Sequence, residues 1–193
     1  IPVPFSRTLA DDLTGIRFPC ISKPRNGRGS RDVRVLNSAS DAMSLKIALG
    51  KAAEAILVQD KIDGVEYTVQ MVADVNGDLR AIVPVRVGLK RGITLRAETE
   101  AEPRVIAACR AIHQAIPTKG SYNIQLMLSV DGAVMPFEIN PRVSTTLCLV
   151  VAAGIDPIAV FLEHTENDRS PSFVEGVQLR RHWTNHFFNE TNL

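Results

Sequence analysis

Phe137-Glu138-Ile139-Asn140-Pro141-Arg142 is the most informative segment of this 193-residue chain. Alternate side chains of a β-strand point to the same face, so Glu138 and Asn140 are expected to project together. Carboxylate and amide oxygens suit Mg²⁺, which also keeps substrate phosphates as ligands. Pro141 ends the strand, and Arg142 then emerges where its guanidinium could hold a phosphate or a carboxylate.

The preceding strand is expected to add a third oxygen ligand. Asp131-Gly132 predicts a turn between strands at 121–130 and 133–140. Residues whose numbers sum to about 263 then face each other, which places Gln125 opposite Glu138. The pattern predicts a metal site on one face of a hairpin, and a polar strand end with solvated side chains is the plain alternative.

The rest of the chain predicts an α+β protein built on antiparallel strands. Further strands are expected at 18–23, 33–36, 56–59, 66–75, 79–87 and 177–180. Helices are expected at about 40–54, 103–115, 147–153 and 157–163. In the first helix, the apolar positions at helical spacing include Met43, Ile47 and Ala48, and Lys90-Arg91-Gly92 is expected in a loop.

Composition narrows the functional class. Hydrophobic residues make up 45% of the chain, which allows a real core, and 22 basic against 21 acidic side chains argue against a nucleic-acid binder. The three widely spaced cysteines indicate reduced thiols and no zinc site. No apolar run reaches membrane-spanning length and no signal peptide is visible, so a cytoplasmic protein that does not bind membranes is expected.

Two segments together resemble a known family. Gly120-Ser121-Tyr122-Asn123-Ile124-Gln125 followed by Glu138-Ile139-Asn140-Pro141-Arg142-Val143-Ser144 resembles the ATP-grasp superfamily, especially the ATP-binding halves of the carbamoyl-phosphate synthase large subunit. The resemblance implies an ATP-grasp fold in which two α+β lobes with antiparallel sheets enclose a nucleotide cleft. It implies one domain at 1–165, with a smaller glycine-loop lobe at 1–60 and a larger metal-binding lobe at 61–165. A C-terminal tail with one strand follows at 166–193.

The resemblance also implies roles for the polar hairpin. In this family the residues that match Gln125, Glu138 and Asn140 hold the magnesium or manganese ions that bridge the ATP phosphates. The arginine that matches Arg142 lies beside the phosphate-transfer centre.

A basic residue and a glycine-rich loop are similar to the family's phosphate-binding elements. Lys23 ends an expected strand, where the family has a lysine or arginine on the nucleotide phosphates, so the resemblance implies both binding and catalytic roles for it. The expected cover over the β- and γ-phosphates includes four loop residues: Asn26, Gly27, Gly29 and Ser30. Taken alone, this loop is equally well read as an ordinary hairpin turn.

The segment 59–66 resembles the family's adenine hinge. By position, Lys61 and Ile62 would offer backbone groups to adenine, and Glu66 would accept hydrogen bonds from the ribose. Asp60 stands where the family usually has glutamate, so its contact would come from a shorter side chain. Three further basic residues, Arg86, Lys90 and Arg91, come from a region that the family often brings onto phosphate or substrate.

The chain departs from the family pattern near its start. Phe5 occupies a usual lysine position, and Arg7 substitutes only if the register shifts. Family members also carry an N-terminal domain that helps bind the acceptor, and none precedes Ile1. A separate or removed segment is therefore expected to supply it, and a homodimer is compatible with the pattern.

The resemblance implies an ATP- and Mg²⁺-dependent ligase that forms an acyl phosphate from a small carboxylate for attack by an amine or ammonia. Carboxylate–amine ligation and carbamoyl-phosphate-type phosphorylation are the main forms, and biotin-dependent carboxylation is less favoured. A degenerate domain that binds nucleotide without catalysis and a non-enzymatic α+β interaction module are the alternatives.

Overall fold

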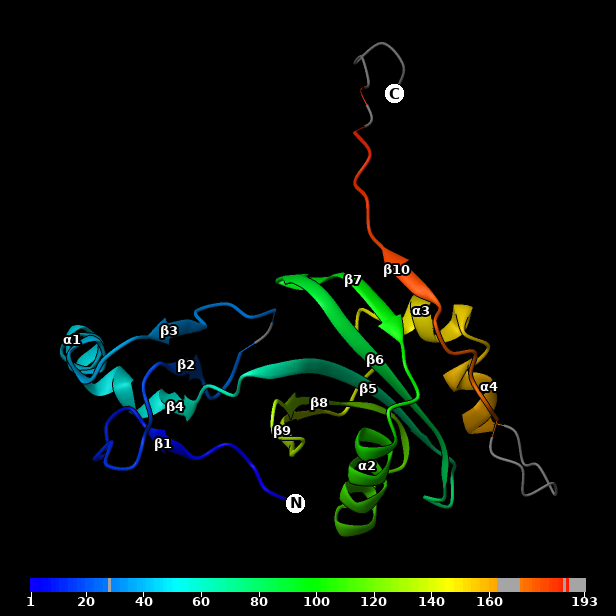
Figure 1. Ribbon diagram of the computed structural model, residues 1–193, viewed down its shortest axis with the longest axis horizontal. Helices are drawn as coiled ribbons and strands as arrows, with labels where there is room; N and C mark the ends of the chain where they lie inside the picture. The colour runs from blue at the N-terminus through cyan, green and yellow to red at the C-terminus, as the bar shows by residue number, and fades with distance from the viewer. Residues whose placement is uncertain (28, 163–170, 186, 188–193) are drawn as a thin grey trace.

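The computed structural model describes residues 1–27, 29–162, 171–185 and 187. It contains two antiparallel sheets, of four and six strands, and the chain passes from one to the other between residues 60 and 64 (Figure 1). The predicted α+β architecture is confirmed. Arg28 of the glycine-rich loop and the end predicted for the last helix at residue 163 lie outside the described residues. None of the helices in the described part has the length and apolar character needed to cross a bilayer.

The small sheet has the order β1-β4-β2-β3, formed by β1 (Ser6–Thr8), β2 (Cys20–Pro24), β3 (Arg34–Leu36) and β4 (Ile56–Asp60). One face is covered by α1 (Ala39–Leu49) and the 3₁₀ helix η1 (Gly50–Ala55). Cys20 and Val58 lie on this covered face. Lys23 and Gln59 alternate onto the opposite face. Lys23 and Gln59 are thereby directed away from the core of the small sheet.

Helix α1 begins as predicted, because the Ser38 side chain accepts a hydrogen bond from the Asp41 backbone N–H. Its buried side differs from the expectation. Met43, Ile47 and Ala48 are all exposed, and Ala42 is the fully buried position. Apolar residues lie all around this helix, so their spacing does not select the side that packs on the sheet.

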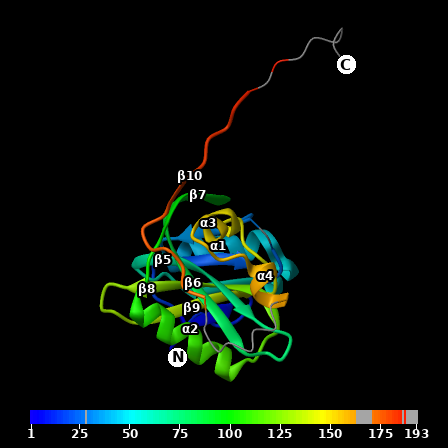
Figure 2. The same cartoon turned by 90° about the vertical axis from the view of Figure 1, so that its right-hand side faces the viewer.

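The large sheet has the order β10-β7-β6-β5-β8-β9. Its strands are β5 (Gly64–Ala73), β6 (Leu79–Arg91), β7 (Ile93–Thr99), β8 (Gly120–Ser129), β9 (Val134–Asn140) and β10 (Gln178–Arg180). Helix α2 (Pro103–Ala115) covers one face, and α3 (Leu147–Ala152) and α4 (Pro157–Leu162) pack on the other. Residues 182–185 run away from both sheets in the two views (Figures 1 and 2).

The prediction of a loop at Lys90-Arg91-Gly92 is wrong. β6 continues to Arg91, and Ile93–Thr99 forms a strand that the sequence reading did not identify. Only Gly92 lies between the two strands, with a φ of 70° that glycine adopts without strain. Arg96 and Glu98 alternate with Ala97 in β7, and these charges obscured the strand pattern.

Gly64 stands where the chain enters the large sheet. It pairs with Ser129 on β8, and a Cβ atom at this position would lie 2.1 Å from the Leu128 carbonyl oxygen. Such a contact is far below van der Waals distance, so only glycine allows β5 to approach β8 this closely. Gly64 therefore has a packing role at the crossing between the sheets.

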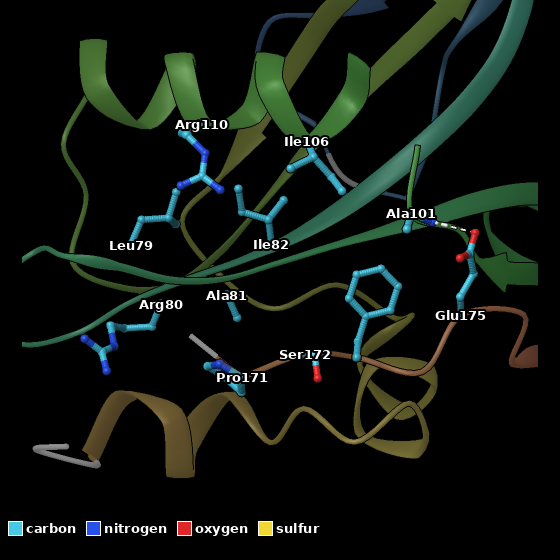
Figure 3. A pocket seen from close by; sticks show the side chains of 11 residues that line it. Leu79, Arg80, Ala81, Ile82, Ala101, Ile106, Arg110, Pro171, Ser172 and Glu175 are labelled. Atoms are coloured by element: carbon cyan, nitrogen blue, oxygen red, sulfur yellow. Dashed lines mark hydrogen bonds between the residues drawn. The ribbon is translucent and has the colours of Figure 1, made fainter. Parts of the chain in front are cut away.

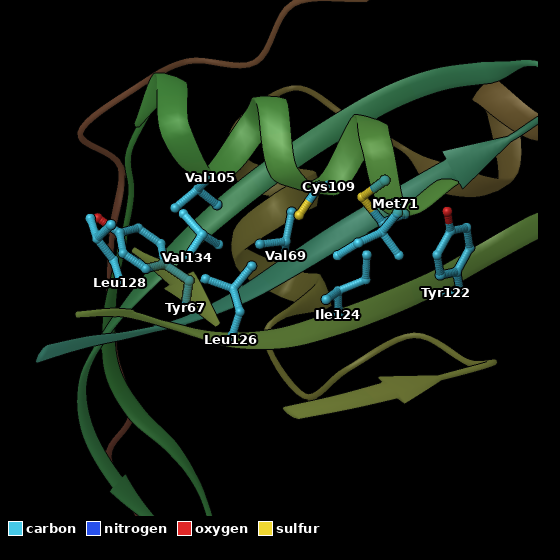
Figure 4. Packing of buried hydrophobic residues seen from close by; sticks show 11 residues of the cluster. Tyr67, Val69, Met71, Val105, Cys109, Tyr122, Ile124, Leu126, Leu128 and Val134 are labelled. Carbon is cyan, nitrogen blue, oxygen red and sulfur yellow. The ribbon is translucent and has the colours of Figure 1, made fainter. Parts of the chain in front are cut away.

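Helix α2 and the strands beneath it form a dry core (Figure 4). Tyr67, Val69 and Ile124 point toward α2, and Cys109 points from the helix toward them. Because side chains alternate along β5 and β8, Glu66 and Gln125 lie on the face away from α2. The alternation of side chains that directs apolar residues toward α2 thus directs Glu66 and Gln125 to the opposite face of the sheet.

Cys109 gives this core a pH signature. Burial raises the pKa of its thiol to about 12, whereas the unperturbed value is 9.0. The raised folded pKa gives stability that is complete below pH 9 and is lost as pH rises toward 12. We expect Cys109→Val to flatten the alkaline fall in unfolding free energy by about 1.4 kcal/mol per pH unit at most. Urea unfolding at pH 8 to 10.5 checks this, and equal slopes in both proteins would contradict it.

Candidate functional site

The predicted oxygen ligands share one face of the large sheet. Gln125 lies directly opposite Glu138, as predicted, and Asn123 lies opposite Asn140. Directly opposed residues of an antiparallel pair project to the same side. We call this surface of β5, β8 and β9, which carries Glu66, Gln125, Glu138 and Asn140, the oxygen face.

Asn123 supports the oxygen face and was not assigned a role from the sequence. Its side chain is buried and donates to the Arg142 carbonyl oxygen at 2.7 Å. The Asn140 amide nitrogen in turn donates to Asn123 Oδ1 at 3.3 Å. The numbers of Asn123 and Asn140 also sum to 263, so the turn that pairs Gln125 with Glu138 predicts this pair as well. The sequence therefore contained the information needed to place Asn123 beside Asn140. The network holds the amide of Asn140 and the chain entering Arg142.

Lys23 reaches from the small sheet toward the oxygen face. Its ammonium donates to Gln59 Oε1 at 3.1 Å and to the Phe137 carbonyl oxygen at 3.3 Å. It also lies 5.4 Å from the centroid of the Phe137 ring. Burial lowers the pKa of Lys23, and the nearby Glu138 carboxylate partly opposes that shift. Lys23 is therefore a partly desolvated cation that contacts Phe137, the residue next to the predicted metal ligand Glu138.

Asp60, which was expected to contact the nucleotide, lies on the side of the small sheet away from Lys23. Both carboxylate oxygens of Asp60 accept hydrogen bonds from Arg17, one from its backbone N–H and one from its Nε, each at 2.9 Å. Asp60 is buried on the α1 side of the small sheet, whereas Gln59 lies on the same side as Lys23. The structure does not bring the Asp60 carboxylate to the oxygen face, because successive residues of β4 point to opposite faces.

The hinge residues connect the two sheets. Lys61 and Ile62 lie between β4 and β5, and the Lys61 ammonium pairs with the Asp63 carboxylate. Glu66 lies on the oxygen face beside half-buried Met127, its partner on β8. Met127 received no role from the sequence, and its signal was its period-two spacing from Gln125.

The three basic residues near the end of β6 have different fates. Lys90 donates to Glu66 Oε1 at 2.6 Å and to Gln125 Oε1 at 3.3 Å, so its ammonium lies on the oxygen face. Arg86 pairs with Glu98 at 3.0 Å and with Glu100 at 3.1 Å. Arg86 pairs with Tyr67 on β5, and Tyr67 faces α2. Arg86 therefore lies on the α2 side of the sheet, opposite to the oxygen face. Lys90 therefore lies at the predicted ligands, Arg86 does not, and the Arg91 side chain is exposed.

The glycine-rich loop joins β2 to β3. Its predicted phosphate-contacting residues are all exposed: Asn26, Gly27, Gly29 and Ser30. Gly29 and Ser30 have φ values of 64° and 56°. The Gly29 carbonyl oxygen lies 3.6 Å from where a Cβ of Gly92 would stand, so the loop meets the β6–β7 turn. The loop's backbone thus reaches the large sheet next to Lys90.

The model of one protein family matches residues 52–185, more than half of the chain. Its description is ATP-grasp in the biosynthetic pathway with Ter operon. The chain belongs to the ATP-grasp family. No curated protein sequence is significantly similar to it.

Solved ATP-grasp structures share the fold. An N5-carboxyaminoimidazole ribonucleotide synthetase in complex with ADP has a TM-score of 0.69 and 16% identity, and covers 83% of this chain and 47% of its own. A biotin carboxylase from Campylobacter jejuni has a TM-score of 0.63 and 21% identity, and covers 82% and 41%. An L-amino acid ligase from Bacillus licheniformis has a TM-score of 0.61 and 21% identity, and covers 81% and 41%. The chain therefore spans less than half of each of these solved proteins.

Within the ATP-grasp fold, Arg142 follows the oxygen face directly. Its side chain is exposed, and its Nη1 donates to the Val143 carbonyl oxygen at 3.0 Å. No ion pair holds the Arg142 guanidinium among the described residues. A guanidinium held this loosely is available to an anionic group.

The departure at the start of the chain has a structural counterpart. The Arg7 guanidinium carbon lies 4.7 Å from the centroid of the Phe5 ring. Phe5 joins the small sheet through its carbonyl oxygen, which accepts from the Asp60 backbone N–H at 2.9 Å. Arg7 is thus stacked on the residue that replaces the usual lysine.

The donor set fits a hard cation. The part of the chain that the structure describes holds no cluster of three among His, Cys, Asp and Glu. The oxygen face instead offers the Glu138 carboxylate with the amide oxygens of Gln125 and Asn140 beside it. Such a set suits Mg²⁺, which binds through one or two carboxylates and keeps phosphate oxygens as ligands.

A pocket between β6, α2 and the segment around Phe173 is separate from these residues (Figure 3). It has a volume of about 330 Å³ and is lined by Leu79 and Ile82 of β6, Ile106 and Arg110 of α2, and Phe173. Leu79 begins β6 and Lys90 lies near its end, so at about 3.3 Å per residue the two are roughly 36 Å apart. This pocket contributes nothing to the oxygen face.

Proposed function

We propose that this chain binds ATP with Mg²⁺ or Mn²⁺ between its two sheets and transfers the terminal phosphoryl group to a carboxylate. ADP leaves in this step, and an amine or ammonia then attacks the acyl carbon of the acyl phosphate and displaces inorganic phosphate. The observation that carries the proposal is the shared face of Gln125, Glu138 and Asn140, with the Lys23 ammonium reaching across to the adjacent Phe137 carbonyl.

Each side chain of the oxygen face has a defined task in this proposal. Gln125, Glu138 and Asn140 hold the metal, which when bound offsets the charge of the phosphate oxygens. Lys23 and the loop from Asn26 to Ser30 hold the terminal phosphate in line with the attacking carboxylate. The exposed guanidinium of Arg142 stabilises the charge on the transferred group.

The hinge binds the nucleoside in this proposal. The backbone groups of Lys61 and Ile62 pair with the adenine edge, and the Glu66 carboxylate accepts hydrogen bonds from the ribose. Met127, beside Glu66, offers an apolar surface to the base. The Asp60 contribution is confined to its backbone, because Arg17 occupies its carboxylate.

The acceptor is proposed at the level of chemical class. Carboxylate–amine ligation and carbamoyl-phosphate-type phosphorylation both fit a carboxylate beside Arg142. An L-amino acid ligase and a biotin carboxylase share the fold of this chain, so the fold does not select one reaction. Because the chain spans less than half of these solved proteins, we propose that a further segment or a partner chain completes the acceptor site.

One observation favours a second candidate, a domain that binds nucleotide without catalysis. Phe5 replaces the usual lysine of the family, and Arg7 is stacked on it. A missing cation there weakens the hold on the phosphates, whereas the complete oxygen face favours catalysis.

Calorimetric titration with ATP, with and without Mg²⁺, tests the proposal. ATP with Mg²⁺ at one hundred times Kd is expected to raise the unfolding free energy by about 2.7 kcal/mol. A panel of carboxylic acids, tested on the protein with its flanking regions, is expected to include one that stimulates phosphate release. Binding without any acid-stimulated release supports the nucleotide-binding candidate, and no thermal shift with ATP supports a non-enzymatic interaction module.

A further inference from the structure

Lys90 joins two residues that the proposed function assigns to different ligands. Its ammonium lies 2.6 Å from Glu66 Oε1 and 3.3 Å from Gln125 Oε1. The side chains of Lys90 and Glu66 are only 26% and 24% exposed, so water screens this contact less than a surface ion pair. The Lys90 ammonium therefore binds both Glu66, the proposed hydrogen-bond acceptor for ribose, and Gln125, a proposed metal ligand.

The local backbone explains how Lys90 reaches this position. Pairing between β5 and β6 ends at Tyr67 and Arg86, so Lys90 lies beyond the part of β6 that pairs with β5, where β6 pairs only with β7. The β6–β7 register shifts on both sides of Leu89, which changes the direction of the side chains at the end of β6. The Lys90 side chain then extends back to β5 and β8, with 24 and 35 residues separating it from its two partners.

The present contacts of Lys90 conflict with ligand binding. A divalent cation on Gln125 Oε1 would stand next to the ammonium that already uses this oxygen, and like charges at short range repel. The ribose hydroxyls likewise compete with Lys90 for Glu66 Oε1. A triphosphate supplies the negative charge that would draw the ammonium away from both residues.

We propose that Lys90 is an internal counter-ion that excludes free divalent metal from the oxygen face and yields its place only when nucleotide arrives with the metal. This inference rests on the proposed function, because it uses the roles assigned there to Glu66 and Gln125. It goes further in assigning a binding order, in which metal without nucleotide binds poorly and Lys90 moves onto the phosphates of the metal–nucleotide complex.

Mn²⁺ binding measured by the electron paramagnetic resonance signal of the free ion tests the exclusion directly. For Lys90→Gln without nucleotide, we expect Mn²⁺ to bind on the order of tenfold more tightly than to the wild type, because one nearby positive charge is gone. For the same variant, we expect the affinity for ATP measured by calorimetry with Mg²⁺ to fall by a similar factor. The opposite signs of the two changes identify a counter-ion, since a purely structural ion pair would alter stability and leave both affinities alone.

Two further variants separate charge from packing. Lys90→Arg keeps the charge and is expected to leave Mn²⁺ affinity within about twofold of the wild type. Lys119→Gln removes one charge from an exposed side chain near the Gly77 turn, at the other end of β6, and is expected to change neither affinity.

Three results would overturn the inference: unchanged Mn²⁺ affinity in Lys90→Gln, an equal gain in Lys90→Arg, or an equal gain in Lys119→Gln. Failure of the proposed function has another signature, because the wild type would then bind no ATP with Mg²⁺. If the wild type did not bind ATP but Lys90→Gln still bound Mn²⁺ more tightly than the wild type, the counter-ion role of Lys90 would stand. Only its proposed contact with the nucleotide would be lost.

Discussion

Replacing Glu138 with glutamine is expected to weaken Mn²⁺ binding in the presence of ATP by roughly 100-fold, equivalent to about 2.7 kcal/mol. Glu138 is the carboxylate of the proposed metal set, opposite Gln125. Glutamine preserves the size and one oxygen but removes the charge that attracts a hard cation. Acid-stimulated phosphate release is expected to fall at least as far, because the metal offsets charge as the phosphoryl group is transferred.

The matched control for this change is Glu54→Gln. Glu54 is an exposed glutamate of η1 in the small lobe, so the control makes the same chemical change away from the oxygen face. Electron paramagnetic resonance of Mn²⁺ and thermal unfolding are measured for both variants. Because Glu138 is exposed, we expect little change in Tm. Equal Mn²⁺ affinities in Glu138→Gln and the wild type would remove the metal assignment.

Lys23→Gln is expected to lower the affinity for ATP with Mg²⁺ by roughly 30- to 100-fold, or about 2 to 2.7 kcal/mol. The Lys23 ammonium is held by two neutral oxygens, Gln59 Oε1 and the Phe137 carbonyl, so a triphosphate would supply its strongest counter-charge. The empty protein is expected to keep its Tm or gain slightly, because a desolvated charge has been removed. Calorimetry and thermal unfolding measure the two effects separately.

The lowered pKa of Lys23 adds a pH dependence to this prediction. Since the folded protein disfavours the charged form, ATP affinity is expected to fall as pH rises through that lowered pKa, earlier than for an ordinary lysine with a pKa of 10.5. The stability of the empty protein changes in the opposite direction, because deprotonation relieves the burial of charge.

Lys51→Gln provides the control for Lys23, since Lys51 is exposed in the same lobe. If Lys23→Gln bound ATP as tightly as the wild type, Lys23 would have no role at the phosphates. An equal fall in both variants would point to the net charge of the lobe.

The hairpin that carries the oxygen face was predictable because its determinants are close together in the chain. The Asp131-Gly132 turn and period-two alternation set the register, and a shift by one residue would have moved Gln125 and Glu138 to opposite faces. Helix α2 was predictable for the same reason, since Pro103 stands at its first turn and the Glu102 side chain caps it.

The missed strand β7 and the buried side of α1 depend on partners distant in sequence. Strand β7 exists because β6 and β10 pair with its two edges, and β10 follows it by some eighty residues. Helix α1 buries Ala42 because of the shape of the small sheet beneath it, which the apolar residues around the helix do not encode locally.

The sequence by itself determined the ATP-grasp family, the α+β class and the pairing of Gln125 with Glu138, because motifs, alternation and turn chemistry act over a few residues. Only the tertiary structure decided that Asp60 is held by Arg17, and that Lys90 rather than Arg86 reaches the oxygen face. These placements depend on which face a strand presents and on charges brought together from 24 to 43 residues away. Such long-range contacts form only when the two sheets assemble, so no local pattern in the chain specifies them.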